Sequence, residues 1–335
     1  MRYVYILLLL AINAGISKAQ TVKLIEQGKP CSIRGLSVVN DHVAWISGSK
    51  GHIAQSTDGG LTWKWQQLKG YEQSDFRDIE AFSDKEAIIM SSGTPALILK
   101  TVDGGLSWKE VYKNEDKSYF LDAMDFAGKQ HGFVMGDPID GKFLLLETKD
   151  GGLNWNKHAV QPAAVDGEAA FAASGTCLTV NAKTMQLTLV TGGSVARKIT
   201  VNGKKADALN LPLAQGKPAA GIFSVANGNS SEVFVGGNYE KNNRADSVAC
   251  YLPMGKKTSK PELANQQPAG FQSCVIYLQG ATFISTGTSG SNITTDGGIN
   301  WKPFDTISYN ACQKAKQGKL VIFAGDRGKI GILQL

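Results

Sequence analysis

Short apolar runs alternate with turn residues along almost the whole chain. In these runs apolar and polar positions alternate over six or seven residues, and clusters of Gly, Asp, Asn and Lys separate them. This period predicts half-buried β-strands. The 38 Gly residues and the aromatic content of 8% agree with it. The pattern therefore predicts an all-β protein.

The runs repeat in one order: strand, turn, strand, loop, strand, turn, strand. Seven first strands are predicted, at residues 33–39, 76–82, 120–126, 168–174, 221–226, 271–277 and 307–313. Matching second strands end in Gly, the residue that a tight exit needs, at residues 42–48, 131–136, 232–237 and 320–325. We therefore expect seven units of four antiparallel strands, with six or eight units as the alternatives.

One octapeptide marks the turn before the fourth strand in four of these units. Its copies are STDGGLTW (56–63), TVDGGLSW (101–108), TKDGGLNW (148–155) and TTDGGINW (294–301). Their Asp residues lie 45, 47 and 146 residues apart, and the last gap is about three periods. Periods of about 40–50 residues are typical of propeller blades. The fourth and fifth units lack the octapeptide and carry residues 189–200 and 250–257 in its place.

The octapeptides resemble the Asp-box (BNR) motif, which implies a hairpin between the third and fourth strands of a propeller blade. An Asp side chain can accept turn N–H bonds, and a Gly-Gly pair allows positive φ. Each Trp then begins a strand and can pack between sheets. The structural residues predicted in this way are Asp58, Trp63, Asp103, Trp108, Asp150, Trp155, Asp296 and Trp301. Catalytic or calcium-binding Asp residues are the alternative, but four equivalent residues on separate blades cannot converge on one substrate.

The two ends of the chain complete the last blade. Residues 307–313, 320–325 and 329–335 supply only three strands, whereas residues 21–27 form an unassigned strand at the other end. Pairing of the two ends would close the ring and remove exposed strand edges. We therefore expect a seven-bladed β-propeller whose N-terminal strand completes the last blade.

The first 19 residues have the pattern of a secretory signal peptide. Met1 and Arg2 precede an apolar run from Tyr3 to Ile16, and small residues flank a cleavage point before Gln20. No second apolar stretch of spanning length follows, so we expect no membrane insertion after cleavage. Residues 20–335 would then form a single propeller domain that is secreted or periplasmic, and we expect it to be a monomer.

Charge and cysteine content exclude several classes of function. The formal charge of +6 is spread along the chain with no long basic block, which argues against nucleic acid as a partner. No glycine fingerprint, phosphate loop or nucleophile elbow occurs, and no metal or cofactor is expected. The cysteines could form up to two disulfides or remain buried thiols, and they are Cys31, Cys177, Cys250, Cys274 and Cys312.

Propeller topology places candidate binding residues on the face opposite the octapeptides. First strands begin on that face, so polar residues near their starts would ring the mouth of the central channel. The candidates are Arg34, Arg77, Asp78, Asp122, Glu168, Ser273 and Asn310, and neighbouring loops add Asp137, Tyr239, Arg244 and Arg327. We expect a charged pocket there that binds an anionic or polar ligand.

An enzyme is the alternative interpretation of the same residues. Asp-box propellers include sialidases, and Asp122 and Glu168 on adjacent blades could form a carboxyl pair of the glycosidase type. The chain would then be a glycoside hydrolase or lyase that acts on a polar glycan. However, SIRGL (32–36) lacks the aromatic residue and the Pro of the sialidase arginine motif.

A second resemblance covers nearly the whole mature chain. Its segments are DFRDIEAF (75–82), FLDAMDF (120–126), MGDPIDGKF (135–143), GEAAFAASGTC (167–177), GIFSV (221–225) and QSCV (272–275). Together they resemble exported bacterial propellers related to the photosystem II assembly and stability factors. This resemblance implies a non-enzymatic platform that holds a partner chain, in part through surface arginines. Some relatives carry an oxidoreductase label, for which this chain has no redox motif. A protein segment or a polar or anionic glycan is therefore the expected ligand.

Overall fold

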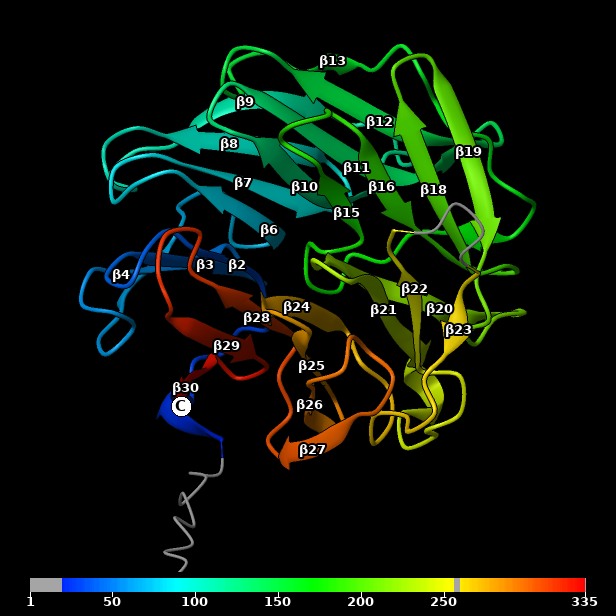
Figure 1. The fold of residues 1–335 in the computed structure, drawn as a ribbon. Helices are drawn as coiled ribbons and strands as arrows, with labels where there is room; N and C mark the ends of the chain where they lie inside the picture. Colours follow the sequence, from blue (N-terminus) through cyan, green and yellow to red (C-terminus); the bar gives the residue numbers. More distant parts are fainter. Residues whose placement is uncertain (1–19, 256–259, 335) are drawn as a thin grey trace, which may run out of the picture.

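Seven antiparallel sheets surround a central axis in a computed structural model, which describes residues 20–255 and 260–334 (Figure 1). Each sheet has its first strand at the axis and its later strands farther out, so the predicted seven-bladed β-propeller is confirmed. The predicted signal peptide lies outside the described residues.

The first three blades follow the predicted strand order. Blade one contains β2 (Ile33–Val38), β3 (Ala44–Gly48), β4 (His52–Ser56) and β5 (Lys64–Gln67). Blade two contains β6 (Asp75–Ala81), β7 (Ala87–Ser92), β8 (Ala96–Thr101) and β9 (Lys109–Asn114). Blade three contains β10 (Leu121–Ala127), β11 (His131–Ile139), β12 (Lys142–Thr148) and β13 (Asn156–Lys157).

Blades four to seven complete the ring. Blade four contains β15 (Leu178–Val180), β16 (Leu187–Val190), β18 (Arg197–Asn202) and β19 (Lys205–Asn210). Blade five contains β20 (Lys217–Asn227), β21 (Ser231–Asn238), β22 (Ala249–Pro253) and β23 (Glu262–Leu263), and short strands β14 (Glu168–Ala169) and β17 (Gly192–Gly193) extend its inner edge. Blade six contains β24 (Cys274–Gln279), β25 (Thr282–Gly287), β26 (Gly290–Thr294) and β27 (Lys302–Asp305). Blade seven contains β28 (Ala311–Lys314), β29 (Val321–Gly325), β30 (Lys329–Gln334) and β1 (Thr21–Glu26).

Strand β1 is the outer strand of blade seven, as the sequence predicts. It pairs antiparallel with β30, with Thr21 opposite Gln334 and Val22 opposite Leu333. The first and last described strands of the chain are therefore neighbours in one sheet. Within the described residues, the only helix is the short 3-10 turn η1 (Tyr239–Lys241), and no helix is long and apolar enough to cross a membrane.

Each Asp side chain of the four boxes folds back onto its own hairpin. In the second box, Asp103 accepts hydrogen bonds from the Ser107 N–H at 3.0 Å, the Ser107 hydroxyl at 2.6 Å and the Thr101 hydroxyl at 2.8 Å. These bonds lower the pKa of Asp103 to about 2. The other three boxes repeat the pattern, so the four carboxylates hold the turns of their own hairpins through hydrogen bonds.

The second Gly and the Trp of a box pack against the preceding blade. Gly152 has a φ of +83°, and a Cβ there would lie 2.4 Å from Ile88 Cδ1 of blade two. Trp155 and Trp301 are buried in such interfaces, whereas Trp63 and Trp108 are only half-buried. The hydrophobic core is thus divided among the interfaces between neighbouring blades, where the boxes help to seal it.

Blade four differs from the sequence prediction. Its first strand is β15 rather than residues 168–174, and the turn before its fourth strand is the short hairpin at residues 202–205 rather than residues 189–200. Leu178 and Val180 both pack in the apolar cluster of this blade, while residues 171–176 leave the sheet and cross the channel. A short apolar segment has the same composition whether it forms a strand or crosses the channel. The sequence pattern therefore does not distinguish a first strand from a crossing segment at residues 171–176.

Candidate functional site

The ring has two faces that differ in which loops and strand ends they carry. First strands end, and the Asp boxes lie, on one face, which we call the box face. First strands begin, and the chain crosses between blades, on the other, which we call the opposite face. The central channel therefore opens on both faces, and different parts of the first strands line its two ends.

A plug segment, residues 171–176, lies across the channel. The Ser174 hydroxyl donates to the Ser273 carbonyl of blade six at 2.7 Å, and Gly175 packs on Asp78 of blade two. Gly175 has a φ of +72°, and a Cβ there would lie 2.3 Å from Asp78 Oδ1, so only glycine fits. The plug segment thus connects blades on opposite sides of the ring.

Arg34 and Arg77 contact the plug segment from the opposite face. Nη1 of Arg34 donates to the Ala173 carbonyl at 3.3 Å, and Nη1 of Arg77 donates to the Ala172 carbonyl at 3.4 Å. Burial, followed by the neighbouring Arg77 charge, lowers the pKa of Arg34. Arg77 also forms an ion pair with Asp75 at 2.7 Å and keeps 29% of its side chain exposed. The two predicted arginines therefore meet at this mouth.

Other polar residues predicted to line the channel mouth form hydrogen bonds with one another. Asn310 donates to Asp326 at 2.9 Å and to the Ile33 carbonyl at 3.0 Å, and Ser273 donates to the Asn310 carbonyl at 2.6 Å. Arg327 is exposed beside this network. Burial raises the pKa of Asp326, but hydrogen bonds from Ser32 and Asn310 outweigh it and hold the pKa below its usual range. An anionic Asp326 therefore stands close to Arg34.

The structure does not bring Asp122 and Glu168 together as a carboxyl pair facing a ligand. Glu168 is buried, and its two carboxylate oxygens bind Arg197 and the Thr191 hydroxyl. Asp122 is 0% exposed, and neither carboxyl oxygen has a hydrogen-bond partner among the described residues. Burial, with a contribution from Asp137, raises the pKa of Asp122 well above its usual range. Glu168 is therefore committed to Arg197, a partner that the sequence did not reveal.

The remaining predicted residues lie around the opposite face. Asp137 accepts the Ala170 N–H at 3.0 Å and borders a cavity of about 520 Å³. Arg244 forms an exposed ion pair with Asp246 and borders another cavity of about 250 Å³. Tyr239, which is 48% exposed, packs edge-on against the Phe223 and Phe271 rings. These residues are too widely spread to be one site.

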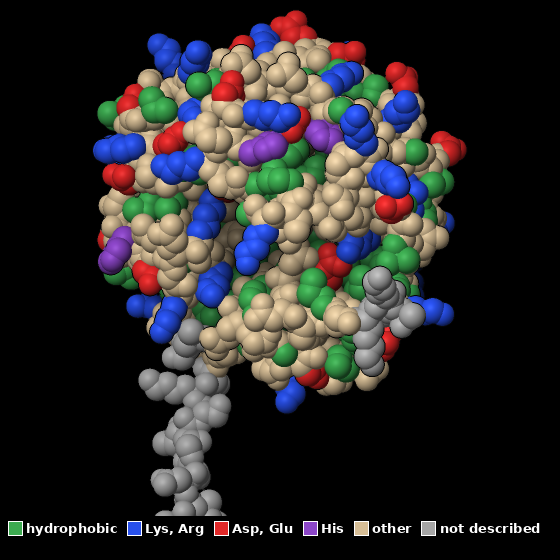
Figure 2. Space-filling model, turned by 45° about the horizontal axis from the view of Figure 1, so that its top comes forward, with side chains coloured by type: hydrophobic (Ala, Val, Ile, Leu, Met, Phe, Trp, Pro, Cys, Tyr) green, Lys and Arg blue, Asp and Glu red, His purple; other side chains and the backbone are tan. Residues whose placement is uncertain are grey.

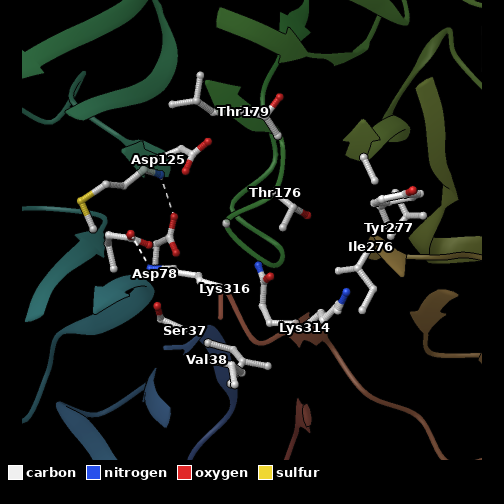
Figure 3. A pocket seen from close by; sticks show the side chains of 18 of the residues that line it. Ser37, Val38, Asp78, Asp125, Thr176, Thr179, Ile276, Tyr277, Lys314 and Lys316 are labelled. Carbon is white, nitrogen blue, oxygen red and sulfur yellow. Dashed lines mark hydrogen bonds and ion pairs between the residues drawn. The ribbon is translucent and has the colours of Figure 1, made fainter. Parts of the chain in front are cut away.

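A cavity of about 340 Å³ occupies the box-face end of the channel (Figure 3). The ends of all seven first strands line it, and Gly175 and Thr176 of the plug segment contribute to the lining. Figure 3 shows Asp78 and Asp125 on one side and Lys314 on another. The surface view in Figure 2 shows a hollow bordered by Lys and Arg side chains. Asp78 therefore lines this cavity instead of ringing the opposite mouth as predicted.

Most charged groups of this cavity already have partners. Asp78 accepts the N–H groups of Ile79 and Met124, and Asp125 accepts those of Phe126 and Val180. Burial raises the pKa of Asp78 to about 8 and that of Asp125 to about 7. The lysines donate to backbone carbonyls, and Lys316 also pairs with Glu80. Sequence reasoning missed this end of the channel because only the starts of the first strands were considered.

Metal binding has no support in residues 20–255 and 260–334. No group of three or more His, Cys, Asp or Glu side chains is arranged there to hold a metal ion.

One family model matches part of the chain. The family model described as photosynthesis system II assembly factor YCF48 matches residues 16–118, which is less than half of the chain. No curated protein matches the sequence. The match supports the resemblance to these assembly factors in the first two blades.

Solved structures with a similar fold include YCF48 itself. YCF48 bound to a D1 peptide has a TM-score of 0.69 at 15% identity, with 94% of this chain and 95% of that chain covered. YCF48 from Cyanidioschyzon merolae has a TM-score of 0.66 at 14% identity, covering 94% and 99%. The Neurospora crassa Pan2 WD40 domain has a TM-score of 0.61 at 14% identity, covering 90% and 88%. Identities this low establish similarity of fold.

Proposed function

We propose that this chain is an exported, non-enzymatic propeller that holds a segment of another protein on the face opposite the Asp boxes. The observation that supports this best is the convergence of Arg34 and Arg77 at the channel mouth, each bonded to one plug carbonyl at more than 3.2 Å. A carboxylate of a partner would be a stronger acceptor for these guanidinium groups than a backbone carbonyl.

The two ends of the channel differ in what they can offer a ligand. At the box face, the charged groups of the cavity bind backbone groups of the inner strands or each other. At the opposite face, the Arg77 guanidinium is partly exposed and Arg34 lies beside it. An acidic segment or a chain terminus is therefore the ligand class that the arginines favour.

The solved YCF48 structure with a D1 peptide supports a protein segment over a glycan. A propeller of the same fold holds a peptide in that structure, although the identity is only 15%. The glycosidase alternative has no such support, because Glu168 is bound to Arg197 and Asp122 is enclosed. The proposed ligand is therefore a peptide, and the propeller serves as a platform for assembly.

The test is binding of the mature chain to a peptide array that pairs acidic sequences with their amide counterparts. Arg77→Ala and Arg34→Ala should each weaken an acidic hit by about 1–3 kcal/mol, the scale of a lost charge-assisted bond. Lys149→Ala, an exposed change on the box face, is the matched control and should leave affinity unchanged. Affinity that ignores both arginines but falls with Lys149→Ala would overturn this placement.

Export and oligomeric state have their own tests. N-terminal sequencing of the protein recovered outside the cytoplasm should begin at Gln20, and light scattering should give the mass of a monomer. Retention of residues 1–19 in the recovered protein would contradict export by a cleaved signal peptide.

A further inference from the structure

Two cysteines face each other across the interface between blades six and seven. Cys274 lies at the start of β24 and Cys312 lies in β28, the inner strands of these blades. Their sulfur atoms are 3.9 Å apart, and the Cys312 N–H points to the Cys274 sulfur at 3.5 Å. Both are fully buried in one apolar cluster. The other cysteines belong to different blades: Cys31 precedes β2, Cys177 precedes β15 and Cys250 lies in β22.

The sulfur of Cys274 stands where other interfaces use an oxygen. Ser224 of blade five accepts the Val275 N–H of blade six at 2.8 Å, and Asp78 plays the same part between blades two and three. An N–H bond to sulfur is weaker than a bond to a hydroxyl or carboxyl oxygen. Among these N–H bonds between inner strands, the one between blades six and seven therefore has the weakest acceptor.

We propose that Cys274 and Cys312 form a disulfide that joins the inner strands of blades six and seven when the chain folds under oxidising conditions. The sulfur atoms need to close from 3.9 Å to about 2 Å. The N–H contact to sulfur already holds the two strands within side-chain reach. Since both thiols are buried in the finished ring, oxidation takes place before this interface is packed.

Thiol–disulfide exchange with a small disulfide such as oxidised glutathione supplies the chemistry. One of the two thiolates, for example that of Cys274, attacks one glutathione sulfur, and one glutathione thiolate leaves. Cys312, after losing its proton, attacks the Cys274 sulfur and displaces the second glutathione. Two protein thiols are oxidised, one glutathione disulfide is reduced, and the two protons end on the glutathione thiols.

Hydrogen bonding distinguishes the two thiols once the interface is packed. Burial acts to raise its pKa, but hydrogen bonds from the Cys312 thiol and N–H outweigh burial and lower the pKa to about 7. Burial raises the pKa of Cys312 well above its usual range. A thiolate is the nucleophile in exchange, so a pair still reduced in the packed ring would react first at Cys274, whereas exchange before packing can begin at either thiol.

The experiment refolds the full mature chain with either reduced or oxidised glutathione. Free thiols are then blocked under denaturing conditions, and disulfides are mapped by mass spectrometry. We expect five free thiols in the reduced sample, three in the oxidised one, and a single peptide pair that joins Cys274 to Cys312. The oxidised protein should also melt higher, by on the order of 5 °C, because the bond constrains the unfolded chain.

Variants separate this pair from the other buried thiols. Cys274→Ser and Cys312→Ser should each lose both the disulfide and the gain in melting temperature, whereas Cys250→Ser should keep both. If a variant fails to fold, the disulfide map of the unaltered protein still shows whether Cys274 and Cys312 are bonded. Five free thiols after oxidative refolding, or a disulfide that maps to another pair, would overturn the proposal.

Discussion

Asp78 of blade two accepts the Met124 N–H of blade three, with 2.7 Å between Oδ2 and N. Ser37 accepts the Ala81 N–H in the same way, and Asp125 accepts that of Val180. First strands of neighbouring blades belong to different sheets and share no ladder of their own. Side chains therefore connect the blades at the centre of the ring, and two of the connecting groups titrate.

Stability should fall as the pH rises from about 4 to about 8. Burial raises the pKa of Asp78 from 3.8 to about 8 in the folded protein, so in this window the folded state holds a proton that the unfolded state releases. The contribution of Asp78 to the free energy of unfolding is therefore largest below this window. It falls as the pH rises through the window and is constant above it. Denaturant titrations at a series of pH values would measure the slope.

Asp78→Asn should reduce that slope without abolishing it, because the amide is neutral at every pH while the raised pKa values of Asp125 and Asp122 still contribute. Asp84→Asn, which changes an exposed carboxylate on the box face, should leave the slope as it is. An unchanged slope in Asp78→Asn would show that Asp78 is ionised in the folded protein at neutral pH.

Glu168→Gln should destabilise the protein by about 3–5 kcal/mol, because it leaves the mostly buried Arg197 without its charge partner. Asp246→Asn breaks the exposed pair with Arg244 and should change little. Thermal and denaturant unfolding would give both values. Normal stability of Glu168→Gln together with a loss of some measured turnover would instead revive the hydrolase interpretation.

Removal of residues 20–27 should expose the edge of β30 and cause aggregation or a large loss of unfolding cooperativity. The buried Val22 also leaves its apolar cluster in this deletion. Lys23→Ala keeps the strand and should behave like the unaltered protein. Size-exclusion chromatography and a melting curve check both. A monomeric deletion variant with the original melting curve would count against closure by β1.

Trp301→Ala should cost about 3–5 kcal/mol of unfolding free energy, because this fully buried ring fills the interface between blades five and six. Trp63→Ala should cost less, since that ring is only half-buried at the edge of its apolar cluster. Chemical denaturation of the two variants gives the comparison. Equal losses would show that the box Trp residues act through turn geometry and not through burial.

The fold could be predicted because it is repeated. Four copies of one octapeptide, seven alternating first strands and an unassigned strand at residues 21–27 each indicated blades and closure, and the strand pairing confirms them. The exception is blade four. Residues 171–176 are small and apolar like a strand, and only contacts with Arg34 and Ser273 from distant blades show that they cross the channel.

The candidate site could be predicted only in part. Arg34 and Arg77 occupy equivalent positions in adjacent blades, so their meeting at one mouth follows from the repeat. The ion pair of Glu168 with Arg197 does not follow from the repeat, because it depends on where β18 lies relative to the start of blade four. The repeat fixes which residues lie at one height along the axis. The repeat carries no information on which of these residues form hydrogen bonds or ion pairs with one another.

Pairing of Thr21 with Gln334 also sets the order of events during synthesis. A chain that emerges from its N-terminus presents β1 first and β30 last, so the outer strand of blade seven has no partner until nearly the whole polypeptide is available. Loop closure over such a separation is slow compared with the formation of hairpins inside a single blade. A nascent chain can therefore form its first six blades in sequence, but the ring becomes circular only in the final step.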